Sequence, residues 1–245
     1  MPDKTAEITP RFRSVEERER HASMISRTRF VRLVNENFTT EGYYVTLSCD
    51  RESGIEIRHA YNRKPTEEQI REGYEALKKE TTNYIRRIRR SCPDAKIIAV
   101  MGFGKKNDNP HVHLLMEDVP EDVINAKWKA GYVRRLEHLR EHNLDEHGKD
   151  CGQGFVGLAN YLYDNHWQPC QGKHRYMRTR NLQYPEPDRR VPCRRKYTAD
   201  RPPKAPKGYF LQETMITPYG FMRFRYVREP AESFYLYKKK RELRR

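Results

Sequence analysis

Two histidines separated by one valine are the residues of this chain whose type and spacing best suit catalysis. His111 and His113 lie in the apolar stretch NPHVHLLMED, residues 109–118. In a β-strand, side chains two positions apart point to the same face, so both imidazoles lie together and Val112 points away. Their Cα atoms are then about 6.5–7 Å apart, close enough for both rings to bind one metal ion. The alternative is two polar residues on the solvated face of an ordinary strand.

A pair of tyrosines follows about 50 residues later, in the candidate helix FVGLANYLYDNHW. A metal ion beside a DNA backbone polarises a phosphoryl oxygen, and a tyrosine that attacks the phosphodiester conserves its bond energy as a phosphotyrosine. Tyr161 and Tyr163 differ by about 200° around a helix, so they do not act together on one phosphate. The alternative role for either tyrosine is that of a core or rim aromatic residue.

The overall charge favours a polyanionic partner. The chain has 245 residues, a formal net charge of +15 and only 36% hydrophobic residues. Nucleic acid is the commonest partner of such a basic protein. No run approaches the roughly 20 apolar residues of a membrane span, and the N-terminus lacks an apolar signal segment. We therefore expect a soluble protein of the cytoplasm, with no membrane partner.

Alternating and helical patterns predict the elements that must hold these residues. Thr66 and Gln69 form a capping-box pattern at the start of a long helix with one apolar face. The apolar stretch 96–103 and the histidine strand, joined by a turn, predict a hairpin in the centre of a sheet. Further strands are predicted at 43–49, 55–61 and in a hairpin at 209–227, and further helices at 120–131 and 155–167, with 132–139 ambiguous.

Composition divides the chain into three parts. Residues 1–29 are charged and aperiodic, which favours a loosely packed arm with a surface helix, and we assign residues 1–40 to this N-terminal arm. Residues 41–184 carry the predicted sheet and helices and form the expected catalytic domain. Residues 185–245 are a basic Pro/Arg-rich segment followed by the hairpin and a tail, YKKKRELRR, which is either a DNA-binding arm or a solubilising end.

Four stretches in the same order as in a known family carry a resemblance: YYVTLSCD, IIAVMGF followed by NPHVHLLME, INAKWKAGYV, and GLANYLYD followed by KHRYMRTRNLQYPEP. Together, over about residues 42–190, they resemble the HUH endonucleases, specifically the single-tyrosine rolling-circle replication initiators of bacterial plasmids and phages. The resemblance implies an α+β, RRM-like (ferredoxin-like) antiparallel sheet with helices packed on one face. It also implies nicking and rejoining of a single-stranded or hairpin origin, with a host helicase as a further partner.

The same resemblance assigns roles to individual residues. His111 and His113 would be the ligands of Mg²⁺ or Mn²⁺, and Tyr161 the nucleophile, with Tyr163 as its competitor. Two positions depart from the family pattern. Gly102 stands about where the family has a third, acidic or polar ligand, and Asp164 replaces the lysine that usually follows the tyrosine by three residues.

These departures lead to two expectations. The positive charge beside the phosphotyrosine would come from another residue, such as Lys173 or Arg175. Asp164, one helical turn from Tyr161, would be a metal ligand or an acceptor for the tyrosine proton.

The segment GKHRYMRTRNL interleaves cations with an aromatic residue. In an extended conformation, alternate positions would place the cations on one side to follow phosphates, while the aromatic ring stacks on an unpaired base. The rival is a solvated surface strand. The expected DNA-binding residues are Lys173, Arg175, Tyr176, Arg178 and Arg180.

Two other functions remain open from sequence. One is a basic RRM-like protein that binds single-stranded nucleic acid without catalysis, in which the histidines are structural. The other uses the same chemistry in a relaxase or transposase, for strand transfer rather than replication. Cleavage that depends on a divalent metal and on both histidines separates the enzyme from the binding protein.

Overall fold

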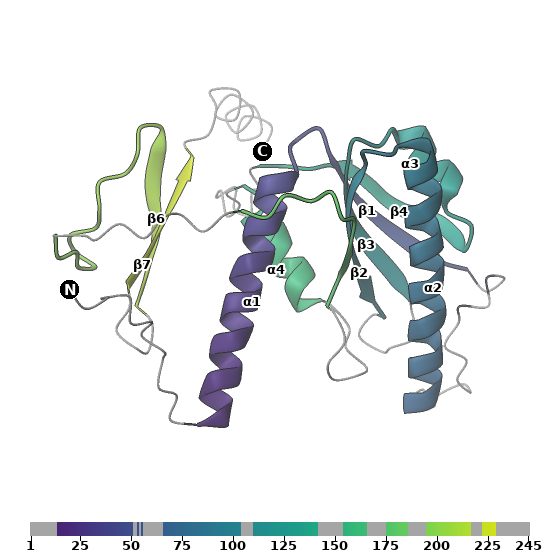
Figure 1. The fold of residues 1–245 in the computed structure, drawn as a ribbon, viewed down its shortest axis with the longest axis horizontal. Coiled ribbons are helices and arrows are strands. Elements are labelled where there is room, and N and C mark those ends of the chain that lie inside the picture. Colours follow the sequence, from purple (N-terminus) through teal and green to yellow (C-terminus); the bar gives the residue numbers. More distant parts are fainter. Residues whose placement is uncertain are drawn as a thin grey trace, which may run out of the picture.

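The structure is a computed structural model that describes residues 14–50, 53, 55, 66–103, 110–141, 154–165, 175–185, 195–216 and 222–228. Figure 1 shows a sheet between two groups of helices, with a separate hairpin beside them. The elements are α1 (Val15–Asn37), β1 (Tyr43–Cys49), α2 (Glu67–Ser91), β2 (Lys96–Gly102), β3 (His111–Glu117), α3 (Glu121–Lys127), β4 (Gly131–His138), α4 (Val156–Asp164), β5 (Met177–Arg178), β6 (Tyr209–Ile216) and β7 (Met222–Arg228).

The main sheet is antiparallel throughout and has the strand order β4-β1-β3-β2-β5. Its first four strands, with α2 after β1 and α3 after β3, form a β-α-β-β-α-β unit in which each crossover skips one strand. This arrangement is compatible with a ferredoxin-like fold. The α+β class and the antiparallel sheet predicted from sequence are confirmed, and β3 with its two histidines occupies the centre of the sheet.

Helix α2 forms where the capping box and the apolar periodicity predict it. The Thr66 hydroxyl accepts a bond from the Gln69 backbone amide, and the Gln69 side chain accepts one from the Thr66 amide. The apolar side of α2 packs with α3 on one face of the sheet, in a cluster that includes Leu77, Tyr84 and Ile88. Polar and basic residues are left on the outer side of the helix.

Helices α1 and α4 cover the opposite face of the sheet, as Figure 1 shows. The expectation of helices on one face holds for α2 and α3 but is wrong for the whole molecule. The physical reason is visible in the strands: Leu114, Leu115 and Met116 are consecutive and all buried, so both faces of β3 need cover. A strand with one solvated face would instead alternate between apolar and polar residues.

Helix α1 packs on the rest of the protein through its C-terminal half. Phe30, Leu33 and Val34 of α1 are almost completely buried against α4 and the sheet. These three residues follow the segment 1–29, for which loose packing is expected, but they belong to the N-terminal arm assigned to residues 1–40. The end of that arm is therefore part of the core, and residues 1–13 lie outside the described residues.

Strands β6 and β7 form a separate two-stranded sheet, as the sequence predicts. The candidate strand at 55–61, apart from Ile55, and the basic tail lie outside the described residues. Among the helices that the structure describes, none has the length and apolar character needed to cross a bilayer.

Candidate functional site

The two histidines of β3 lie side by side on the face covered by α1 and α4. Their ring centroids are 4.8 Å apart and the rings are nearly perpendicular. The prediction that both imidazoles share one face is confirmed. His113 is buried, with 6% of its surface exposed, while His111 at the start of the strand is half-buried.

Strand β1 fixes the ring of His113. Thr46 is its cross-strand partner, and the Tyr44 hydroxyl lies 2.8 Å from Nδ1, with the Thr46 hydroxyl at 3.3 Å from the same nitrogen. Burial, followed by the charges of His111, Arg135 and Arg134, lowers the pKa of His113 to about 3. The ring is therefore neutral at physiological pH, and its Nε2 atom is the nitrogen that neither of these hydroxyls engages.

Helix α4 places Tyr161 beside this pair. The ring centroids of Tyr161 and His113 are 5.7 Å apart, and the Tyr161 side chain is 46% exposed. Tyr163, two positions on, is 2% exposed, and its hydroxyl donates to the Ser23 carbonyl oxygen at 3.2 Å. The buried side of α4, formed by Ala159, Leu162 and Tyr163, thus turns Tyr161 outward. Of the two candidate nucleophiles, only Tyr161 lies next to a histidine ring.

Gly102 leaves the space that the His111 ring fills. The two residues are paired across β2 and β3. A Cβ atom at Gly102 would lie 2.6 Å from Nε2 of His111, so any side chain there would displace the imidazole. Gly102 stands where the family resemblance implies a third metal ligand. The His111 ring occupies the space that a side chain at this position would need, which explains the glycine.

An oxygen donor that sequence reasoning missed lies on β1. Ser48 is the cross-strand partner of His111, so its side chain points to the same face as the histidines. Its hydroxyl is buried and has no hydrogen-bond partner within the part of the chain that the structure describes. Tyr44, Thr46 and Ser48 alternate along YYVTLSC, and this polar period of two is the signal that could have located them.

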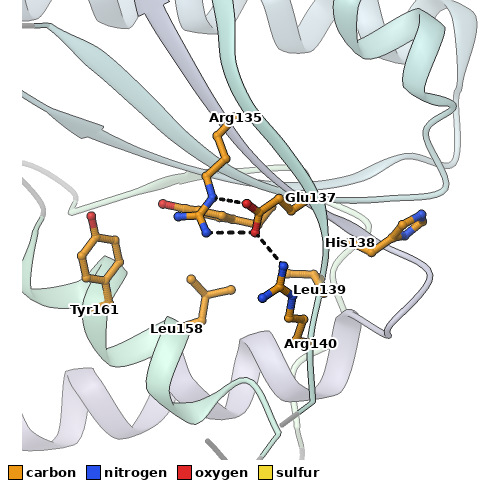
Figure 2. A pocket seen from close by; sticks show the side chains of 8 residues that line it. Arg135, Glu137, His138, Leu139, Arg140, Leu158 and Tyr161 are labelled. Atoms are coloured by element: carbon orange, nitrogen blue, oxygen red, sulfur yellow. Dashed lines mark hydrogen bonds and ion pairs between the residues drawn. The ribbon is translucent and has the colours of Figure 1, made fainter. Parts of the chain in front are cut away.

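A cavity of about 240 Å³ opens beside Tyr161 and is shown in Figure 2. From β4, Arg135 donates to Glu137 at 2.9 Å, and Arg140 donates to the same carboxylate at 3.3 Å. The Arg135 guanidinium also lies 5.3 Å from the centroid of the Tyr44 ring. The residues that line the cavity are Tyr44, Arg135, Glu137, His138, Leu139, Arg140, Leu158 and Tyr161.

Arg135 and Arg140 thus share a cavity with Tyr161, and sequence reasoning had selected neither. Burial, the largest cause, raises the pKa of Tyr44 to about 12, and Tyr161 adds to that rise. The hydrogen bond from Arg135 lowers the pKa of Glu137, which keeps this carboxylate ionised. Arg175, one of the two expected cations, instead stacks on the Tyr163 ring at 4.5 Å, and Lys173 lies outside the described residues.

Asp164 is engaged on another side of α4. The Arg27 guanidinium donates to both of its carboxylate oxygens, one of them at 2.8 Å, and so ties α4 to α1. Within the described ranges, no three His, Cys, Asp or Glu side chains are grouped so that they could hold a metal ion. Asp164 therefore does not join the two histidines in this structure.

The structure separates the predicted DNA-binding residues into two sets. Arg178 and Arg180 are exposed and line a groove beside α2. The Tyr176 ring is half-buried against Phe30, with 4.7 Å between ring centroids, so it packs within the protein rather than presenting a free face. The expected alternation of cations on one side thus describes Arg178 and Arg180 but not Arg175.

Comparison with known proteins adds no family to this geometry. No protein-family model matches the chain, and no curated protein or solved structure shows significant similarity to it. The arrangement itself unites two neighbouring imidazoles, an orphaned hydroxyl, an exposed phenol and a cationic cavity.

Proposed function

We propose that this protein nicks and rejoins single-stranded DNA through a covalent phosphotyrosine at Tyr161, with a divalent metal ion held by His111 and His113. The observation that carries the proposal is the contact of three rings from two elements: Tyr161 of α4 stands 5.7 Å from His113, which stands 4.8 Å from His111. The stability of a surface helix does not require an exposed tyrosine beside two histidines. A catalytic site that brings a nucleophile and a metal ion to one phosphate does require this arrangement.

The donors present suit Mg²⁺ or Mn²⁺. His113 is neutral and has Nδ1 occupied by hydroxyl contacts, which leaves Nε2 for a cation. The buried Ser48 hydroxyl, opposite His111, supplies an oxygen on the same face. Such ions commonly keep water and substrate phosphate oxygens among their ligands, so a short protein donor set is adequate. When bound, the ion would polarise a phosphoryl oxygen and offset negative charge in the transition state.

The chain's own residues carry the transfer. The Tyr161 oxygen forms a bond to phosphorus while the bond from phosphorus to one deoxyribose oxygen breaks. The phenol loses its proton and the departing oxygen gains one, so the strand ends in a free hydroxyl and the protein in a phosphotyrosine. The reverse attack by a strand hydroxyl rejoins the DNA and frees Tyr161.

Arg135 provides the positive charge that the family's lysine would supply. It enters the same cavity as Tyr161 from β4, and its bonds to Glu137 hold the guanidinium in a fixed orientation, as Figure 2 shows. A guanidinium binds phosphate oxygens through paired N–H groups. We assign Arg135 to the phosphate on which Tyr161 acts.

The biological setting proposed for this chemistry is the start of rolling-circle replication of a plasmid, phage or integrated element. A nick with a retained phosphotyrosine provides a free strand end and preserves the energy for later closure. Relaxases and transposases of the same chemical type would use the same residues for strand transfer.

A pair of tyrosine variants tests the function. The wild type, Tyr161→Phe and Tyr163→Phe are incubated with Mn²⁺ and a labelled single-stranded library that contains hairpins, and covalent adducts are resolved on a denaturing gel. We expect an adduct with the wild type and with Tyr163→Phe, since Tyr163 is buried away from the histidines. Tyr161→Phe should form none. An adduct that persists in Tyr161→Phe contradicts the assignment.

Binding without any cleavage would favour the rival function. In that case the protein binds single-stranded nucleic acid and the histidines are structural. Tight binding of single-stranded DNA by the wild type, with no adduct and no cleavage in Mn²⁺ or Mg²⁺, would establish this alternative.

A further inference from the structure

A second hollow, on the side of the sheet covered by α2, is lined by five exposed arginines. Arg86, Arg89 and Arg90 come from the last turns of α2, and Arg178 and Arg180 come from β5 and the residues after it. Ile85 and Met177 lie between them in a groove of about 710 Å³. We call this surface the arginine groove. Its α2 wall packs on the face of the sheet opposite the histidines, so it is separate from the proposed nicking site.

No carboxylate within the described part of the chain forms an ion pair with the arginine groove. Arg89 donates to the Pro93 carbonyl oxygen at 3.1 Å, and Arg178 lies 4.6 Å from the centroid of the Tyr184 ring. The positive charge of the groove is therefore open to an external anion.

Protein stability explains only part of this cluster. Arg89 and Arg90 in the last turn of α2 interact favourably with the helix dipole. Like charges three and four residues apart, as between Arg86 and both of them, are destabilising on a helix. Arg178 and Arg180 belong to β5 and the residues after it, so they do not interact with the dipole of α2. A ligand accounts for the gathering of all five.

The spacing suits an anion with regularly repeated charges. Arg86 and Arg90 are one helical turn apart, about 6 Å along the axis, and Arg178 and Arg180 are about 6.5–7 Å apart if extended. A phosphodiester strand has charges that recur at a similar interval, and guanidinium groups bind them in pairs. Free phosphate or a single acidic side chain would engage only one or two of these cations.

A single strand fits better than a duplex. Proteins that bind unpaired strands combine a basic groove with exposed aromatic rings on which bases stack. Tyr184 is 57% exposed and lies under the guanidinium of Arg178, one of the arginines that line the groove. Apolar Ile85 and Met177 offer further surface to base rings.

We infer that the arginine groove is a second binding site for single-stranded nucleic acid, located between α2 and the edge strand β5 and apart from Tyr161. Such a site grips a stretch of strand other than the one that enters the histidine site. It holds the strand through phosphates, without chemistry and without a metal ion. The inference goes beyond the proposed nicking activity, because it stands on the groove alone.

Binding in metal-free buffer tests the inference apart from cleavage. The anisotropy of a fluorescein-labelled single-stranded oligonucleotide is measured with EDTA over a series of salt concentrations. The variants are Arg86→Gln/Arg89→Gln/Arg90→Gln and, from the other wall, Arg178→Gln/Arg180→Gln. Glutamine preserves helix propensity in α2. A matched control, Arg18→Gln/Arg20→Gln/Arg29→Gln, removes three exposed charges from α1.

We expect the triple groove variant to lose affinity on the order of tenfold and to reduce the salt slope by about 2, since each single-strand phosphate contact contributes about 0.7. The β5 variant should lose affinity in the same direction, and the α1 control should change little. An equal loss in the α1 control, or no loss in either groove variant, overturns the inference. A loss as large on duplex of the same sequence overturns the single-strand assignment.

Adduct formation distinguishes this result from failure of the nicking proposal. Groove variants should still form the Tyr161 adduct at saturating DNA. If the wild type forms no adduct but still binds single-stranded DNA through the groove arginines, the nicking proposal fails and the groove proposal stands.

Discussion

Arginines line both the cavity beside Tyr161 and the arginine groove, but within the described residues a carboxylate holds those of the cavity and none of those in the groove. In the cavity of Figure 2, Arg135 and Arg140 share Glu137, whereas the five cations of the arginine groove have no such partner in the described part of the chain. A guanidinium that must meet one phosphate at the point of attack benefits from a fixed orientation. Arginines that bind successive phosphates of a strand need no fixed orientation, and they bind more strongly when no carboxylate of the protein competes for them.

The two hollows also differ in their surroundings. The cavity adjoins a buried neutral imidazole and an exposed phenol, which are groups for chemistry. The described lining of the groove consists of arginines, threonines and the apolar residues Ile85 and Met177. Positive charge alone therefore does not distinguish the two hollows, because the arginines beside Tyr161 are bound to a carboxylate and those of the groove are not. Four experiments test this difference.

Removing both histidines should have the largest effect. His111→Ala/His113→Ala should reduce cleavage on the order of 10³-fold, because the ion that stabilises the transition state loses its protein ligands. Metal-free DNA binding should stay within about twofold of wild type, since the arginine groove is untouched. Quantified adduct yield in Mn²⁺ and anisotropy in EDTA measure the two effects. His21→Ala on α1 is the control, and equal cleavage by both variants would contradict the metal assignment.

Acidification should destabilise the fold through His113. The folded state lowers its pKa to about 3, so the neutral ring stabilises the fold fully above the unfolded pKa of about 6.5, and this contribution is lost as pH falls towards 3. At pH 5 the loss is about 2 kcal/mol. Urea unfolding at pH 7.5 and pH 5 should show this extra decrease for wild type relative to His113→Gln. Identical pH dependence in both proteins would show that His113 is not held neutral.

A methyl group at Gly102 should weaken the metal site without touching the groove. Its Cβ would meet Nε2 of His111 at 2.6 Å and push the ring away. We expect Gly102→Ala to lose Mn²⁺ affinity on the order of tenfold by titration calorimetry. Gly157→Ala on α4, where an added Cβ has nothing within 4 Å, is the matched control and should bind Mn²⁺ normally. A normal Mn²⁺ affinity in Gly102→Ala would show that the position of His111 is not needed.

The smallest expected effect follows from releasing the paired arginines. Glu137→Gln removes the charge that Arg135 and Arg140 share, so the cavity gains free positive charge. Single-stranded DNA should bind roughly two- to fivefold more tightly at low salt, and this gain should vanish at high salt. Glu75→Gln, which removes a carboxylate paired with Lys78 on α2, is the control. A gain of equal size in the control would assign the effect to net charge rather than to the cavity.

Much of the fold could be predicted from local patterns. The alternation around His111 and His113, the capping box at Thr66 and the opposite facing of Tyr161 and Tyr163 each follow from geometry over a few residues. These patterns placed the strand and the long helix correctly and put the two tyrosines on different sides of α4. Such features need no knowledge of the rest of the chain.

Features that depend on distant segments were missed. Phe30 of α1 is buried because it packs against α4, a distant segment of the sequence. Arg135 of β4 and Tyr161 of α4 line the same cavity although they are far apart in the sequence. Asp164 was expected near the chemistry, but Arg27, 137 residues away, engages it. The arginine groove likewise unites α2 with β5, so sequence reasoning saw only its β5 half.

Identification of the modified residue tests the central claim most directly. Wild-type protein is incubated with Mn²⁺ and the single-stranded library, digested with protease and nuclease, and the nucleotide-bearing peptide is fragmented by mass spectrometry to distinguish Tyr161 from Tyr163. The account predicts a nucleotide mass on Tyr161 that is absent when His111 and His113 are replaced by alanine. A nucleotide on any other tyrosine, or an adduct that forms equally well without the two histidines, would contradict it.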